Sequence, residues 1–110
     1  MSNYATRTAP QISLPAGSTT GTGAVLDNNG CCSSHTLVTI ASAGVAAGTV
    51  QLQGSLDNLN WVNLGTAITL TASTVQTTGA AITGLPYQFI RASVGTAVSG
   101  GTVAAWVASA

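Results

Sequence analysis

Residues 49–65 read TVQLQGSLDNLNWVNLG and hold the clearest strand–turn–strand signal in the chain. Val50, Leu52 and Gly54 alternate with polar residues, which is the period-two pattern of a half-buried strand. DNLN follows as a turn, and WVNLG is the returning strand. The segment therefore predicts a hairpin. Its acid and tryptophan leave open whether the turn binds a ligand or only closes a sheet.

Short β-prone runs separated by glycine or Asn/Asp turns extend from this hairpin in both directions. They are AVLD (24–27), HTLVTIAS (35–42), AITLT (67–71), TVQTT (74–78), YQFIRASV (87–94) and TVAAWVASA (102–110). No segment combines a helical period with capping residues. Roughly eight short strands at this spacing predict an all-β fold, an antiparallel β-sandwich or jelly roll.

Residues 1–23 have a different character, since they are rich in Pro, Gly, Ser and Thr and show no sustained period. Pro10 and Pro15 exclude a helix there and disfavour a central strand. We therefore expect an extended N-terminal arm over residues 1–23, which becomes ordered on a partner. A single β-sandwich domain is expected over residues 24–110.

Charge is nearly absent from the chain. Arg7, Arg91, Asp27 and Asp57 are the only charged residues among 110, or 4%, whereas globular domains carry about a quarter. An isolated domain with so little charge would associate or precipitate. We therefore expect much of its surface to be buried against another protein or against copies of itself, with a homotrimer as the favoured oligomer.

The composition also argues against other classes of function. There is no basic patch for nucleic acid, and no apolar run reaches the roughly 18 residues of a membrane helix. The N-terminus lacks the pattern of a signal peptide.

Catalysis, cofactors and metals are not expected either. Cys31 and Cys32 are adjacent, which favours buried thiols over a disulfide. His35 is the only histidine, so no metal or cofactor site is predicted. CCSSH cannot provide nucleophile, base and orienting group from neighbouring strand positions, so we expect no enzyme. His35 is expected to be solvated or at an interface.

Four residues are candidates for structural or interface roles: Asp57, Trp61, Arg91 and Trp106. Asp57 could offer a carboxylate to a sugar beside Trp61. The favoured interpretation is an Asx-type turn whose neighbouring tryptophan ring fills the edge of the sandwich. Arg91 lies within an apolar strand, where it could pair with Asp57 or bind backbone carbonyls at a sheet edge or subunit contact.

The order of these features resembles that of a family of virion proteins. VQLQGSLDNLNWVNLG, YQFIRASV and GGTVAAWVASA follow GAVLDNNGCCSSHTLVTI. Over residues 22–110 this order is similar to tailed-phage capsid decoration, or cement, proteins with a jelly-roll-like fold. The resemblance implies a homotrimer on the outer capsid surface of the virion, made in the host cytoplasm, which joins neighbouring major capsid proteins.

A second resemblance is to discoidin-like and other galactose-binding-like modules, through SLDNLNW and the late strand FIR. The turn here lacks their glycine, and their calcium-site acids and disulfide-closed ends are missing. The shortage of charge favours the decoration protein. A carbohydrate-binding module and a tail, fibre or neck component of a phage particle are the alternatives.

Overall fold

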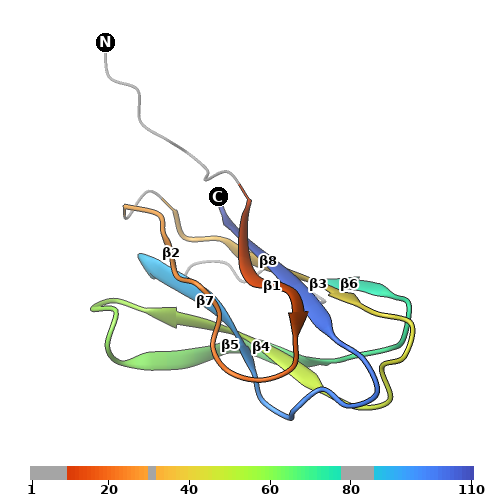
Figure 1. The fold of residues 1–110 in the computed structure, drawn as a ribbon. Coiled ribbons are helices and arrows are strands. Elements are labelled where there is room, and N and C mark those ends of the chain that lie inside the picture. The colour runs from red at the N-terminus through yellow and green to blue at the C-terminus, as the bar shows by residue number, and fades with distance from the viewer. Residues whose placement is uncertain (1–9, 30–31, 78–85) are drawn as a thin grey trace.

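The computed structural model describes residues 10–29, 32–77 and 86–110, and these ranges form strands without any helix (Figure 1). The strands are β1 (Gln11–Ser18), β2 (Leu26–Asp27), β3 (His35–Ala41), β4 (Thr49–Ser55), β5 (Trp61–Thr69), β6 (Val75–Thr77), β7 (Phe89–Val94) and β8 (Val103–Ser109). They make two antiparallel sheets. The prediction of an all-β sandwich with about eight strands is confirmed.

The strand order is that of a jelly roll. Sheet A has the order β1-β8-β3-β6, and sheet B has the order β2-β7-β4-β5. Within this order β4 pairs with β5, β3 with β6, β2 with β7 and β1 with β8, so the pairs are nested around the β4–β5 turn. The chain thus doubles back on itself as one long hairpin. The β3–β8 and β4–β7 pairings wrap that hairpin into two sheets.

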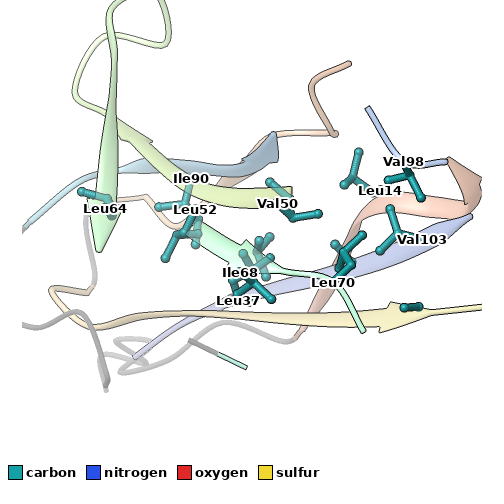
Figure 2. Packing of buried hydrophobic residues seen from close by; sticks show 14 of the residues in the cluster. Leu14, Leu37, Val50, Leu52, Leu64, Ile68, Leu70, Ile90, Val98 and Val103 are labelled. Carbon is teal, nitrogen blue, oxygen red and sulfur yellow. The ribbon is translucent and has the colours of Figure 1, made fainter. Parts of the chain in front are cut away.

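The core lies between the two sheets, where aliphatic side chains from both point toward one another (Figure 2). Successive side chains of a strand face opposite sides, so every second residue enters this space. Val50 and Leu52 of β4 are almost completely buried, and so are Ile90 and Ala92 of β7. The alternation in TVQLQG correctly predicts the two positions on β4.

Two runs that were expected as separate strands, WVNLG and AITLT, form the single strand β5. Its register against β4 shifts between Val50 and Leu52, which places a bulge in the middle of β5. Gly65 lies in this bulge with a φ of 70°, a left-handed conformation that glycine adopts without steric penalty. The glycine therefore bends the strand and does not end it.

The prediction of an extended N-terminal arm over residues 1–23 is wrong for residues 11–18. These residues form the edge strand β1 of sheet A. Leu14 is only 2% exposed and belongs to the core. Pro15 is tolerated because the register of this edge strand shifts between Leu14 and Ser18, where no regular ladder requires its N–H. The sandwich thus begins at β1 and not at residue 24. Residues 1–9 lie outside the described residues.

Leu14→Ala should lower the free energy of unfolding by about 2–4 kcal/mol, because it removes buried contacts and leaves a cavity. Urea titration of dilute protein measures the loss. Ile12→Ala is the matched control, since Ile12 lies on the same strand but is 46% exposed. It should cost roughly 1 kcal/mol or less. Equal losses in the two variants would show that β1 is not a structural part of the domain.

Candidate functional site

The turn between β4 and β5 is organised by the Asp57 carboxylate. Its Oδ1 accepts hydrogen bonds from the N–H groups of Leu59 (2.9 Å) and Asn60 (2.8 Å) and from the Ser55 hydroxyl (2.9 Å). Its Oδ2 accepts a hydrogen bond from Asn60 Nδ2 at 2.6 Å. The Asx-type hydrogen bonds expected at Asp57 are therefore present. The carboxylate is engaged by its own turn and is not held out toward a ligand.

These hydrogen bonds also alter the titration of Asp57. The N–H of Asn60 contributes most and that of Leu59 next, and both stabilise the ionised form. The pKa of the Asp57 carboxyl is therefore held well below its usual range. The turn is fixed most firmly when this group is charged.

Two leucines in this turn are exposed, which the sequence pattern does not reveal. Leu56 continues the alternation of β4 and is expected on the inner face, but it lies beyond the strand and is 66% exposed. Leu59 is 81% exposed. The alternation fails at Leu56 because β4 ends at Ser55 and Leu56 belongs to the turn.

Trp61 lies on the outer face of sheet B and is half-buried. The guanidinium carbon of Arg91 stands 4.0 Å from the centre of its ring. This is the distance of a cation–π contact. The expectation that the ring fills the sandwich edge is wrong, because Trp61 is in register with Ser55, on the face opposite the core.

Arg91 makes a polar contact as well. Its Nε donates a hydrogen bond to Gln53 Oε1 at 2.9 Å, and Gln53 Nε2 donates to Asn63 Oδ1 at 3.1 Å. Arg91, Gln53 and Asn63 are in register on β7, β4 and β5, so they form one row across sheet B. Within the described residues Arg91 makes no ion pair with Asp57. The sequence cannot foresee this row, because it depends on the β4–β7 pairing of distant segments.

The outer surface of sheet B carries mostly polar side chains. We use the name polar face for six of its residues: Gln51, Gln53, Trp61, Asn63, Arg91 and Ser93. Thr49, Ser55 and Phe89 also lie on this surface.

The outer surface of sheet A is mostly apolar, although Thr36 and Thr77 also lie on it. Trp106 of β8 lies opposite Ile12 of β1 on one side and opposite Val38 of β3 on the other. The ring of Trp106 is half-exposed in the middle of this row. We call the following set the apolar face: Ile12, Val38, Ile40, Val75, Ala104 and Trp106.

The charges are distributed unequally between the two sheets. Asp27 is on β2, Asp57 follows β4 and Arg91 is on β7, so all three charged residues in the described ranges belong to sheet B and its turn. Arg7 lies outside those ranges. Within the described residues, sheet A therefore offers a partner a surface without formal charge.

His35 is buried, so the expectation of a solvated histidine is wrong. Its Nδ1 lies 2.8 Å from Ser109 Oγ, which also accepts a hydrogen bond from Asn28 Nδ2 at 3.3 Å. His35 is fully inaccessible and Ser109 is 3% exposed. A substrate could not reach this hydroxyl while the sandwich is closed. The cluster thus joins β3 to β8 and to the segment after β2, and its geometry favours a structural role.

The expectation of cysteine thiols is also wrong. Cys32 is buried and disulfide-bonded. The sequence favours thiols because two adjacent cysteines do not easily meet disulfide geometry. The other cysteine, Cys31, lies outside the described residues.

Comparison of the chain with protein-family models, with curated proteins and with solved structures finds no match. In the described part of the chain, no helix is long and apolar enough to cross a membrane. The same part contains no group of three or more His, Cys, Asp or Glu residues arranged to hold a metal ion.

Asp57→Asn should lower the melting temperature near neutral pH, because it removes the charge that the turn stabilises. The pKa of Asp57 is lower in the folded chain than in the unfolded chain, where it is about 4. Its contribution to stability is therefore full above about pH 4 and is lost as the pH falls toward the folded-state value. The difference in melting temperature between wild type and Asp57→Asn, measured by circular dichroism, should become smaller as the pH falls from about 4 to about 2.

The control compares the Asp27→Asn variant with the double variant Asp27→Asn/Asp57→Asn. Because Asp27→Asn leaves the turn unchanged, the difference in melting temperature between these two proteins should narrow over the same pH range. A difference in melting temperature that stays constant across the acid range would contradict the assignment of the charge effect to Asp57.

Proposed function

We propose that this chain is a structural virion protein, a decoration or cement protein that assembles through the apolar face of sheet A. The observation that carries the proposal is the central position of Trp106 among aliphatic side chains on a surface without formal charge. Contiguous apolar surface of this kind marks protein–protein contact sites. The outer surface of a capsid, with major capsid proteins as partners, is the location that we propose for it.

The fold is compatible with this function but does not assign it. Jelly rolls occur in viral capsid proteins and in lectins, and one fold can serve unrelated functions. The two sheet faces distinguish these classes better. A lectin needs one ligand-binding surface and otherwise a solvated exterior, whereas a cement protein needs a second surface that buries area against protein. The apolar face provides that second surface.

The proposed contact depends on apolar burial and not on ion pairs. Burial contributes about 25 cal/mol for each Å² of apolar surface removed from water. Large aromatic side chains near the centre of an interface commonly carry most of the binding energy. Trp106 has that position on the apolar face. We propose that it anchors both the homotrimer and the contact with the major capsid protein.

Trp106→Ser should convert the homo-oligomer, a trimer in this proposal, to a smaller species in light scattering at micromolar concentration. Trp61→Ser is the matched control, because it makes the same chemical change on the opposite sheet and should leave the oligomer intact. A cooperative thermal transition in each variant shows that it is folded. A wild-type protein that is monomeric, or a Trp106→Ser variant that keeps its size, would contradict the proposal.

Binding to particles should resist salt, because the apolar face has no charges to screen. We expect the protein to stay on capsids in ~1 M NaCl, where the Debye length is about 3 Å. Sedimentation of particles from a phage that encodes the chain measures retention. Particles without the protein should also release their genome at a lower temperature. Release of the protein by moderate salt, or equal heat resistance with and without it, would be evidence against a cement function.

A further inference from the structure

We infer that the polar face of sheet B binds an acidic carbohydrate, with Arg91 receiving a sugar carboxylate and the amides of Gln53 and Asn63 contacting hydroxyl groups. The polar face is a different surface from the apolar face proposed for assembly. Within the described residues, the charge of Arg91 has no acidic partner.

Each acid in the described ranges is occupied elsewhere. Asp57 is bound within its turn. Asp27 Oδ1 accepts hydrogen bonds from the N–H of Asn29 at 2.8 Å and from Gln88 Nε2 at 3.0 Å. In the same ranges, only the Nε–H of Arg91 has a protein acceptor, and that acceptor is the neutral amide of Gln53. The two terminal nitrogens of the guanidinium are left for a ligand.

The guanidinium is also held in one orientation. Its central carbon stands 4.0 Å from the centre of the Trp61 ring, and its Nε donates a hydrogen bond to Gln53. Partial burial lowers the pKa of Arg91. A carboxylate can accept two parallel hydrogen bonds from such a fork. Because the donor is already oriented, little conformational entropy is lost on binding.

The residues around Arg91 favour a sugar over other anions. Gln53 and Asn63 continue the row from Arg91 and offer amide groups, which donate to and accept from hydroxyls. Trp61 adds an aromatic side chain beside them. A nucleic acid requires several cations along its phosphates, but Arg91 is the only cationic residue in the described ranges. A site with one positive charge beside neutral amides complements a ligand that has one carboxylate among hydroxyl groups, such as a hexuronate.

The first test is calorimetric titration of the full chain with trigalacturonate and, in parallel, with the neutral galactotriose. We expect the acidic trisaccharide to bind and the neutral one to bind at least about tenfold more weakly, since a hydrogen bond to a charged group is stronger than one between neutral groups. Arg91→Gln should weaken binding of the acidic sugar by a similar factor. Asn63→Ala should weaken binding of both sugars.

Val75→Ser on the apolar face is the control and should bind like wild type. Arg91→Lys provides a second variant should Arg91→Gln fail to fold: it keeps the charge but loses the planar fork, so binding should again weaken. A triglutamate peptide separates a sugar site from a general carboxylate site, and it should bind more weakly than trigalacturonate.

Three outcomes would overturn the inference: no binding of trigalacturonate at millimolar concentration, equal binding of the neutral sugar or of the peptide, or unchanged affinity in both Arg91 variants. None of these outcomes bears on assembly, which is measured by the oligomeric state and by the Trp106→Ser variant. The two proposals can therefore fail separately.

Discussion

The hydrogen bonds of the Asp57 carboxylate hold the turn around which the jelly roll is arranged. Every other nested strand pair lies further out along the chain from the β4–β5 hairpin. A turn that fixes the register of β4 against β5 also determines which residues of β4 face the core, because a slip of one residue would exchange the two faces. Ser55 strengthens the arrangement, since its hydroxyl donates to Asp57 Oδ1 and accepts the N–H of Asp57.

The two sheets have different outer surfaces. On sheet B the β4–β5 register aligns Gln53 with Asn63, and the β4–β7 register aligns Gln53 with Arg91, whose guanidinium stands over Trp61. On sheet A the outward positions are aliphatic around Trp106. The three charged residues of the described ranges thus lie on sheet B and its turn. We propose that the two sheets bind different partners. The apolar face would bind protein, and the polar face would stay open to solvent and ligand.

Local patterns predict more of this structure than contacts between distant segments do. Alternation predicts the buried side of β4, and turn chemistry predicts the hydrogen bonds of Asp57. The pattern misses β1, because an edge strand with Pro15 and shifts in register has no clean period. It also misses the contact of Arg91 with Trp61 and the burial of His35. Both depend on strands far apart in sequence, β4 and β5 with β7 in one case and β3 with β8 in the other.

Tryptophan fluorescence tests the division between the two faces directly, because the chain has only two tryptophans and each sheet has one on its outer surface. In Trp61→Phe, the emission then comes from Trp106 alone. On raising the protein concentration, or on adding particles, that emission should shift to shorter wavelength and become resistant to acrylamide quenching. In Trp106→Phe, a variant that keeps an aromatic ring on the apolar face, the emission of Trp61 should not change. An emission shift in Trp106→Phe with none in Trp61→Phe would contradict assembly through sheet A.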